Sequence, residues 1–427
     1  MRILVIGNGA REHALAVRLS ADPGVDHLVC APGNPGISAV ARTVPINLSR
    51  PDEVFALADR ERIDLTVVGP ELPLSVGVAD RFLAGDRLLF GPTQSAARLE
   101  SSKAFAKAFM TRHGVPTASF RICESAEAAV RCVRSGEFGF PVVLKADGLA
   151  AGKGVVIATD QNEAEAAITG AMEEARFGSA GSRLVIEECL VGPEVSFFVI
   201  SDGTSVLPIG TAQDHKCIFD EDRGPNTGGM GAFAPSPLID HALHERVMRE
   251  IVEPVVGGMA AEGHPFRGFL YVGLILTTDG PKVIEFNVRL GDPEAQVILP
   301  LIAEPLAPLL AAAAQGALSR TTCRLSSERL VGVVLASRGY PETSESGQPI
   351  AGIAEAERIS GVTVYHAGTA TRDGRLVTAG GRVLTVVGRG AGMADAIATA
   401  YAGVNCITFE GMQYRRDIGR KALPPSR

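Results

Sequence analysis

The segment Val283–Arg289 places polar side chains at alternate positions of a predicted β-strand. Because successive side chains of a strand point to opposite faces, Glu285, Asn287 and Arg289 are expected to share one face. The apolar residues expected on the other face, in the core, are Ile284, Phe286 and Val288. A carboxylate and an amide oxygen suit Mg²⁺ bridging nucleotide phosphates, and a guanidinium suits an anionic substrate or a developing charge. The alternative is an edge strand with one solvated face. Asp292 and Glu294 add two carboxylates nearby and favour the site.

A second candidate is the glycine-rich segment Gly148–Gly154, which superficially resembles a phosphate-binding P-loop. Its spacing is one residue short, Gly154 replaces the metal-binding hydroxyl residue, and a strand-like run follows instead of a helix. We therefore predict a hairpin flap that folds over a triphosphate, with Lys153 and Lys145 supplying positive charge. The alternative is a surface turn, but Lys145 in an otherwise apolar strand argues against it, since an unpaired buried cation is costly.

The N-terminal turn begins like a dinucleotide fingerprint, but Glu12 stands in place of its third glycine. The second predicted strand ends at Cys30 without a carboxylate for the ribose of NAD, which disfavours a nicotinamide dehydrogenase. The remaining expectation is an anion, such as a phosphate, at a helix N-terminus. A turn that only allows helix and strand to pack is the alternative.

Another polar stretch, Gln213–Lys216, precedes a loop rich in glycine at Gly224–Gly231. Glycines permit a ligand to approach the backbone closely. His215 has no histidine at metal-binding spacing, so we expect a hydrogen-bonding role for it rather than zinc coordination.

Length and composition indicate a globular, multidomain chain. Of its 427 residues, 46% are hydrophobic and 21% are charged. A formal net charge of −7 argues against nucleic acid as a partner. Seven scattered cysteines without a CxxC pair are typical of reduced cytosolic thiols. The sequence begins directly in a strand-like run and contains no long apolar stretch, so we expect a cytoplasmic protein without a membrane partner.

The predicted elements position these residues in an α/β chain. Apolar strands at 2–7, 27–33 and 64–71 alternate with helices at 10–20 and 53–63, which predicts a parallel, Rossmann-like sheet in an N-terminal domain over 1–100. A small α+β unit follows, with a hairpin of strands at 141–146 and 155–160, a helix at 162–178 and a strand at 183–190. Asp202-Gly203 and Asp279-Gly280 indicate two further hairpins. Strands at 331–337, 362–368 and 382–388 and a helix at 393–404 form the last block. The expected domains are 1–100, 101–328 with a lid at 120–190, and a small β-rich domain at 329–427.

Twelve segments, in order and over nearly the whole chain, resemble the phosphoribosylamine-glycine ligase (glycinamide ribonucleotide synthetase) family of ATP-grasp enzymes. They are GNGAREHA, APGNPG, VVGPELPL, FGPTQSAARLESSKAFAK, LKADGLAAGKGV, VIEECLVGPEVS, QDHKCIFDEDRGPNTGGMGA, EFNVRLGDPEAQ, RGYP, HAGT, GGRVL and YRRDIG. Ala10, Leu290 and Arg338 depart from the family pattern: Ala10 slightly restricts the phosphate turn, and the other two leave the charged groups intact.

The resemblance implies a set of site residues. The ATP site comprises Lys103, Lys145, Gly148, Gly152, Lys153, Gly154, Glu187, Glu188, Leu190 and Glu194, with the segment 187–190 at the adenine edge and Glu194 at the ribose. The metal ligands are Glu285 and Asn287, and Arg289, Asp292 and Asp214 surround glycine and the phosphoryl-transfer centre. The other substrate residues are Asn8, Gly9, Arg11, Asn34, Pro35, Gly36, Glu71, Lys216, Asn226 and Gly228.

The same resemblance implies ATP-dependent ligation of glycine to 5-phosphoribosylamine in purine synthesis, through a glycyl phosphate, by a monomer that uses Mg²⁺ or Mn²⁺. Phosphoryl transfer depends on positioning and charge neutralisation, which fits lysines, metal ligands and glycine loops without a nucleophilic Ser or Cys. The competing interpretations are another ATP-grasp ligase or carboxylase, a non-catalytic nucleotide sensor, and the dehydrogenase. Intact Glu285, Asn287, Arg289 and Asp292 disfavour the sensor.

Overall fold

The computed structural model describes residues 1–149, 154–174 and 176–424 of the chain. A five-stranded parallel sheet in the order β3-β2-β1-β4-β5 forms the N-terminal part. Its strands are β1 (Arg2–Gly7), β2 (His27–Pro32), β3 (Arg42–Thr43), β4 (Leu65–Val68) and β5 (Leu89–Phe90), and the helices α1 (Ala10–Ser20), α2 (Pro51–Arg60) and α4 (Val78–Ala84) connect them. The predicted Rossmann-like sheet is confirmed, because its continuous apolar strands are buried on both faces.

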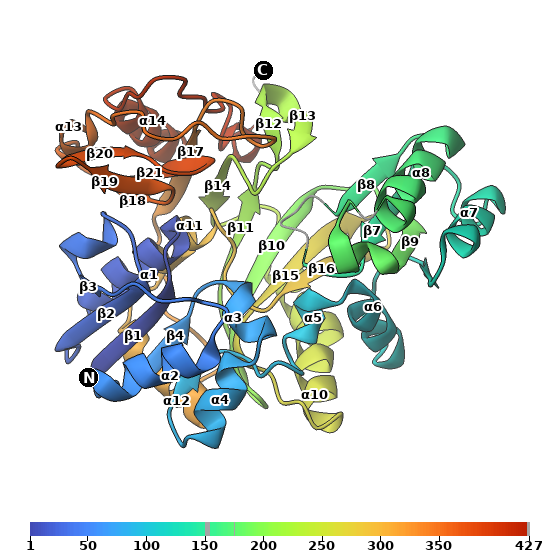
Figure 1. The fold of residues 1–427 in the computed structure, drawn as a ribbon, viewed down its shortest axis with the longest axis horizontal. Coiled ribbons are helices and arrows are strands. Elements are labelled where there is room, and N and C mark those ends of the chain that lie inside the picture. The colour runs from blue at the N-terminus through green and yellow to red at the C-terminus, as the bar shows by residue number, and fades with distance from the viewer. Residues whose placement is uncertain (150–153, 175, 425–427) are drawn as a thin grey trace.

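A small antiparallel sheet in the order β6-β9-β7-β8 forms a lid that projects from the body of the molecule (Figure 1). Its elements are β6 (Phe120–Cys123), α7 (Ala126–Arg134), β7 (Val142–Ala146), β8 (Val155–Ala158), α8 (Gln161–Ile168) and β9 (Leu184–Glu188). The predicted β7–β8 hairpin is confirmed. The helix predicted at 162–178 is shorter: it ends at Ile168 and continues as the π-helical turn Thr169–Glu173.

An eight-stranded sheet runs through the rest of the molecule in the order β16-β15-β10-β11-β14-β17-β21-β18. These strands are β10 (Glu194–Asp202), β11 (Val206–Asp214), β14 (Gly231–Ala234), β15 (Arg267–Thr277), β16 (Gly280–Asn287), β17 (Arg329–Ala336), β18 (Val362–His366) and β21 (Arg382–Gly390). The hairpins predicted at Asp202-Gly203 and Asp279-Gly280 join β10 to β11 and β15 to β16. The strands after residue 328 therefore continue the central sheet, through the pairing of β14 with β17.

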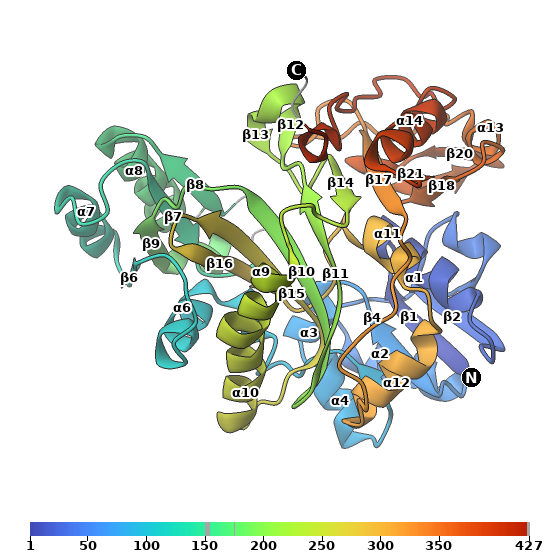
Figure 2. The ribbon, with the colours of Figure 1, turned by 180° about the vertical axis from the view of Figure 1, so that it is seen from behind.

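The remaining helices and two strand pairs complete the fold around these sheets (Figure 2). The helices are α3 (Glu71–Ser75), α5 (Arg98–Ser101), α6 (Lys103–Arg112), α9 (His241–Val247), α10 (Glu253–Ala261), α11 (Ala295–Ile298), α12 (Leu306–Gln315), α13 (Ile353–Glu357) and α14 (Met393–Val404). The paired strands are β12 (Cys217–Phe219) with β13 (Arg223–Asn226) and β19 (Thr369–Arg372) with β20 (Arg375–Thr378). None of the described helices is both long and apolar enough to cross a bilayer.

Candidate functional site

The expected metal strand is β16, and a bulge in it changes the predicted pattern. Opposite β15, the register moves from Gly273–Glu285 to Leu274–Val283, so Ile284 is the extra residue. The expectation that Ile284 enters the core is wrong: Val283 and Phe286 are buried, whereas Ile284 is partly exposed and lines the cavity beside Glu285. Its carbonyl accepts a hydrogen bond from Lys145 Nζ at 3.1 Å. The bulge thus brings Lys145 to the metal strand.

Five polar or charged side chains line a cavity together with Glu285. They are Glu194, Ser196, Asp214, Lys216 and Tyr271, from strands β10, β11 and β15 and the turn after β11. Burial opposes ionisation of Glu285, but Lys216, Lys145 and Lys103 outweigh it and lower its pKa, so the group is anionic at neutral pH. Burial instead raises the pKa of Asp214, and Lys216 opposes this shift. The cavity therefore combines two carboxyl groups whose pKa values are shifted in opposite directions.

Glu285 and Asn287 fit a divalent cation. Neither side chain has a hydrogen-bond partner within residues 1–149, 154–174 and 176–424, so their oxygens are available as ligands. Gly273 lies opposite, where an added Cβ would come within 3.1 Å of Glu285 Cγ, so a larger residue would crowd the carboxylate. The described residues contain no group of three or more His, Cys, Asp or Glu side chains suited to a metal. Two protein ligands suit Mg²⁺ that also takes phosphate oxygens.

Two lysines and a buried glutamate lie together at the position expected to bind phosphate. Glu187, at the end of β9, forms ion pairs with both Lys145 of β7 and Lys107 of α6. Lys107 Nζ also donates to Thr117 Oγ1 at 2.8 Å, and Thr117 in turn donates to the carbonyl of Val283. Burial lowers the pKa of Lys107 to about 8, against the pull of Glu187. The Glu187 side chain is thus engaged by two lysines, so only the backbone of this segment is left for the expected adenine contact.

Lys107 is a residue that sequence reasoning missed. It lies four residues after Lys103 on α6, so both lysines occupy one helix face, which is the signal that could have found it. Lys103 Nζ donates to the carbonyl of Gly148 at 3.1 Å, and burial lowers its pKa although Glu285 raises it.

The flap residues are only partly described. Gly148 contacts Lys103 as above, and the Gly154 carbonyl accepts a hydrogen bond from the Ala146 N–H at 2.8 Å. Gly152 and Lys153 lie outside the described residues.

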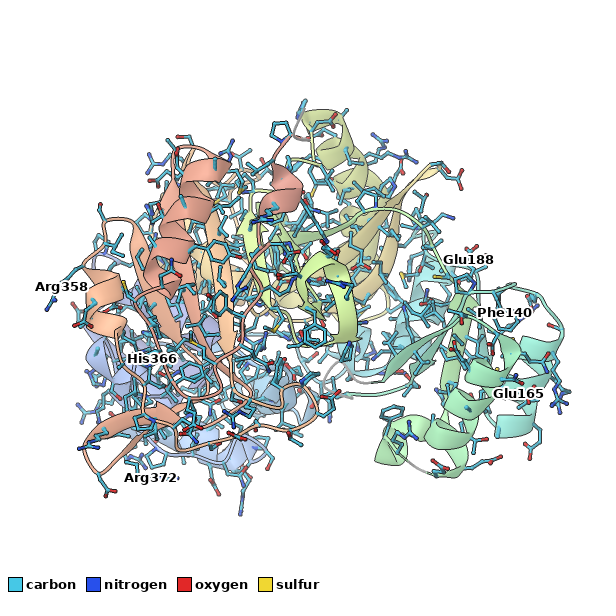
Figure 3. The ribbon with its side chains drawn as sticks, turned by 90° about the horizontal axis from the view of Figure 1, so that it is seen from above. Phe140, Glu165, Glu188, Arg358, His366 and Arg372 are labelled. Atoms are coloured by element: carbon cyan, nitrogen blue, oxygen red, sulfur yellow. The ribbon has the colours of Figure 1, made fainter. Side chains whose placement is uncertain are left out.

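Hinge residues join the lid to the cavity. Glu188 Oε1 accepts a hydrogen bond from the Ser119 N–H at 2.8 Å, and Figure 3 shows Glu188 on the side of the lid nearer the body. Leu190 follows β9, and Glu194 begins β10, where Lys216 Nζ donates to its Oε2 at 2.6 Å. Lys216 thus lines the cavity beside Asp214.

Arg289 is held between two carboxylates. Its Nη2 donates to Glu100 Oε1 at 2.8 Å and its Nε to Glu71 Oε2 at 3.1 Å. Burial opposes the charge, but Glu100 and Glu71 raise the pKa of Arg289, so it stays cationic. Glu71, expected at the phosphoribosylamine site, is therefore near the strand that carries the metal ligands. Sequence reasoning missed Glu100, a buried glutamate in the quoted segment ARLESSK.

Asp292 and its neighbour Glu294 lie in the turn after β16. Asp292 Oδ2 accepts a long hydrogen bond from the Arg11 N–H at 3.4 Å, and Oδ1 one from Gln296 Nε2 at 2.9 Å. Glu294 Oε1 lies 3.4 Å from Ser196 Oγ, and burial together with Asp214 raises the pKa of Glu294 to about 7. Besides Asp292, the turn therefore carries Glu294, whose buried carboxyl group lies beside the cavity.

At the start of α1, the protein's own carboxylate fills the expected anion position. Glu12 Oε2 accepts a hydrogen bond from the Gly9 N–H at 2.6 Å and caps the helix. Added Cβ atoms at Gly7 or Gly69 would collide with this side chain, so these glycines make its space. Glu12 also pairs with Arg11 Nε, and Arg11 Nη1 donates to the carbonyl of Leu290 at 3.1 Å. A substrate phosphate would have to bind beside Glu12 rather than on the Gly9 N–H.

The predicted loop 34–36 packs against the C-terminal strands. Asn34 Nδ2 donates to the carbonyls of Asn8 (2.9 Å) and His366 (2.8 Å), and Pro35 is partly exposed. An added Cβ at Gly36 would lie 2.5 Å from both His13 and His366, so only glycine fits. The N-terminal sheet thereby contacts the last block at His366, which Figure 3 labels above the N-terminal domain.

Two predicted residues lie apart from the cavity lining. Asn226 is exposed in β13, where its Oδ1 accepts a weak hydrogen bond from the Cys217 thiol at 3.5 Å. The Gly228 N–H donates to Tyr340 Oη at 2.9 Å. The hydrogen-bonding role expected of His215 is wrong: its side chain is buried against Phe233, and neither ring nitrogen has a partner among the described residues.

Replacing His13 by Asn is expected to reduce the loss of stability in acid. Burial and then His366 lower the pKa of His13 to about 3 from 6.5, so below about pH 6.5 the unfolded chain binds more protons. The free energy of unfolding therefore decreases as the pH is lowered. For this group the decrease is about 2 kcal/mol between about pH 6.5 and about pH 5. The Asn oxygen can replace Nδ1 as acceptor of the His366 N–H.

Urea unfolding of both proteins at about pH 7 and about pH 5 measures this effect. The stability difference between the two pH values should be about 2 kcal/mol smaller in the variant. Equal differences in both proteins would contradict a neutral buried His13.

Three domain models match the chain in order. Residues 1–100, 101–295 and 330–421 match the N domain, the ATP-grasp (A) domain and the C domain of phosphoribosylglycinamide synthetase. A phosphoribosylamine–glycine ligase from Neisseria meningitidis is 49% identical over 425 residues, which cover 99% of this chain and 100% of that protein. The corresponding ligase of Mesorhizobium japonicum is 47% identical over 430 residues, 100% of each chain.

Solved structures agree with these matches. The crystal structure of the Thermotoga maritima phosphoribosylamine–glycine ligase superimposes with a TM-score of 0.84 at 33% identity and covers 98% of this chain and 100% of that one. The biotin carboxylase domain of Hydrogenobacter thermophilus 2-oxoglutarate carboxylase, solved with MgADP, ADP and bicarbonate, gives a TM-score of 0.73 at 18% identity and covers 97% and 91% of the two chains. At that identity the second likeness concerns the fold alone.

Proposed function

This chain belongs to the phosphoribosylglycinamide synthetase family, and we propose that it makes glycyl phosphate from glycine and ATP before the amine of 5-phosphoribosylamine attacks. It is an ATP-dependent ligase with an ATP-grasp fold that joins glycine to phosphoribosylamine in purine biosynthesis. The observation that carries the proposal is the convergence of Glu285, Asp214 and Lys216 in one cavity, with Lys145 and Lys103 beside it.

An amine reacts poorly with a carboxylate, because a carboxylate is anionic and would have to expel oxide. Activation of the carboxylate by ATP removes this obstacle. A carboxylate oxygen of glycine attacks the γ-phosphorus, the bond to the β-phosphate oxygen breaks, and ADP leaves. The amine of phosphoribosylamine then attacks the acyl carbon, inorganic phosphate leaves and the nitrogen loses a proton. Both steps require positioned substrates and neutralised charge rather than a protein nucleophile.

Lys103 and Lys145 neutralise the triphosphate in this proposal. In the structure the Lys145 ammonium binds Glu187, which also holds Lys107. When Lys145 turns to a phosphate, Lys107 still neutralises the buried carboxylate, so the exchange leaves no unpaired charge in the core. The flap at 148–154, including Gly152 and Lys153, would close over the phosphates and exclude water from the acyl phosphate.

Glu285 and Asn287 would hold a divalent cation, Mg²⁺ or Mn²⁺. Such an ion supplies positive charge at the β- and γ-phosphate oxygens. Asp214 and Asp292 would hold the glycine ammonium group, and Arg289 its carboxylate.

The loops at Asn8–Arg11 and Asn34–Gly36, together with Glu71, would form the phosphoribosylamine site. Lys216, Asn226 and Gly228 complete the substrate residues, and Glu188, Leu190 and Glu194 the nucleoside contacts. We further propose domains at 1–100, 101–328 and 329–427, a monomeric state and a cytoplasmic location.

An isotope experiment tests the intermediate. Purified protein is given Mg-ATP, fresh phosphoribosylamine and glycine labelled with ¹⁸O in its carboxyl group, and phosphate is analysed by mass spectrometry. Transfer of one label into phosphate, with ADP release that needs glycine, supports glycyl phosphate. Ligation with unlabelled phosphate would refute the intermediate, and ADP release independent of glycine would point to another acid substrate.

A further inference from the structure

Four of the quoted C-terminal motifs have no role in the chemistry above, and two of them meet at a single glycine. Tyr340 comes from the segment RGYP after β17, and Arg382 begins β21. The Gly228 N–H donates to Tyr340 Oη at 2.9 Å, and the Gly228 carbonyl accepts from Arg382 Nη1 at 2.5 Å. Both polar groups of one loop residue are therefore held by side chains of the last block.

Arg382 also holds the turn that follows the metal strand. Its Nη1 donates to the backbone carbonyl of Asp292 and lies 3.5 Å from Asp292 Oδ1. Asp292 is partly buried, and Arg382 and Arg11 lower the pKa of its carboxyl group against the effect of burial. One guanidinium thus joins the loop at 227–230 to the turn at 291–294.

The loop and the turn are in direct contact, with no space for larger residues. A Cβ at Gly229 would lie 2.5 Å from Pro293 Cδ, and Gly229 has a φ of +108°, which favours glycine. A Cβ at Gly228 would lie 3.1 Å from Arg382 Cζ and 3.3 Å from Tyr340 Oη. A small shift of Arg382 or Tyr340 would therefore move the loop.

The two clamping side chains are themselves fixed by the sheet. Gly381 has no Cβ because the ring of Tyr340 would lie 2.3 Å from it, and Gln413 Nε2 donates to the Tyr340 carbonyl at 3.0 Å. Ser337 binds the carbonyls of Gly380 and Gly381, next to Arg382. Both clamping side chains are thus anchored at the β17–β21 pair, next to the glycine loop.

We propose that Tyr340 and Arg382 are positioning residues for the ligation: they hold the loop at 227–230 against the Asp292 turn and so fix the groups that receive glycine and phosphoribosylamine. This inference rests on the proposed function. The clamp contacts neither Lys103 nor Lys145 among the described residues, so its expected effect is on the ligation rather than on the lysines proposed to bind the nucleotide phosphates.

The test uses Arg382→Gln, Arg382→Lys, Tyr340→Phe and the double variant Arg382→Gln/Tyr340→Phe in the full chain. Arg389→Gln is the matched control, because Arg389 lies on the same strand, half exposed, and pairs with Glu328 instead. Steady-state kinetics give kcat/KM for glycine and for phosphoribosylamine, and calorimetry gives the Kd for MgADP.

Arg382→Gln should lower kcat/KM for glycine by about 10- to 100-fold, the scale of a misplaced reacting group. The Kd for MgADP should change less than about twofold, and Arg382→Lys should recover part of the activity, since an ammonium can still reach one carbonyl. Because both residues act through Gly228, the double variant should lose little more than Arg382→Gln alone.

Wild-type kinetics in Arg382→Gln would overturn the clamp. A loss of activity that only matches the fraction of protein molecules unable to bind MgADP would do the same. Strictly multiplicative effects in the double variant would also overturn it, because they would show two independent contacts. Failure of the proposed function is separate, since it would appear as a wild-type protein that does not ligate glycine.

Discussion

Replacing Glu285 by Gln should lower the turnover number for ADP formation by at least about 100-fold, the scale of losing one group that stabilises transferring charge. The carboxylate faces the cavity and stays anionic because Lys216, Lys145 and Lys103 outweigh its burial. The amide has nearly the same shape but no charge, so three lysines lose a common counter-charge and a metal loses its anionic ligand.

The fold should survive this change. The Glu285 side chain makes no hydrogen bond in the part of the chain that the structure describes, and the core on this strand is formed by Val283 and Phe286. Steady-state kinetics at saturating Mg-ATP and glycine measure the turnover, and a thermal melt measures the fold. Glu355→Gln, at an exposed position on α13, is the control.

Turnover within about threefold of the wild type would remove Glu285 from the metal site. A collapse of the melting temperature would show that the residue is structural instead. Activity of Glu285→Gln that recovers at high Mn²⁺ would support its role as a metal ligand, because the weakened site would fill by mass action.

Replacing Glu187 by Gln should cost about 3–5 kcal/mol of stability, the usual result of removing one partner of a buried ion pair. Glu187 is 3% exposed and pairs with Lys107 and Lys145, which are themselves buried. The amide cannot neutralise either ammonium group, so two cations remain in the core between the lid and α6.

Hydrogen exchange on β7 and β9 measures the opening of the lid, and urea unfolding measures the whole chain. Adding Lys107→Met should recover part of the loss, because the double change removes one of the uncompensated charges. Glu165→Gln is the control in the same lid, since Glu165 pairs with Arg134 at the surface, where ion pairs contribute little. Unchanged exchange in Glu187→Gln would mean that the two lysines do not depend on this carboxylate.

Local sequence patterns predicted most of the elements correctly. Continuous apolar runs such as the strand at 64–71, and glycine turns such as Asp202-Gly203, depend on neighbouring residues, so they can be read directly. The helix predicted around 393–404 is confirmed as α14. The helix after Asp160 ends earlier than predicted because a π-helical turn replaces its second half, which no local signal marked.

The candidate site was predicted less completely, because its geometry depends on contacts between distant segments. The bulge at Ile284 arises where β16 pairs with β15 and places that side chain beside Glu285. The partners of Arg289 are Glu71 and Glu100, about two hundred residues earlier, and the partners of Gly228 are in the last block.

The sequence by itself determined the N-terminal parallel sheet, the hairpins, the metal pair Glu285 and Asn287 as a prediction, and the family. These depend on periodicity, turn residues and ordered motifs, which are local properties of the chain. Only the tertiary structure decided that Glu12 fills its own helix terminus, that Glu187 holds two lysines and that Arg382 joins the glycine loop to Asp292. A buried charge must find a counter-charge or hydrogen-bond partner wherever the fold supplies one, and sequence separation does not restrict that choice.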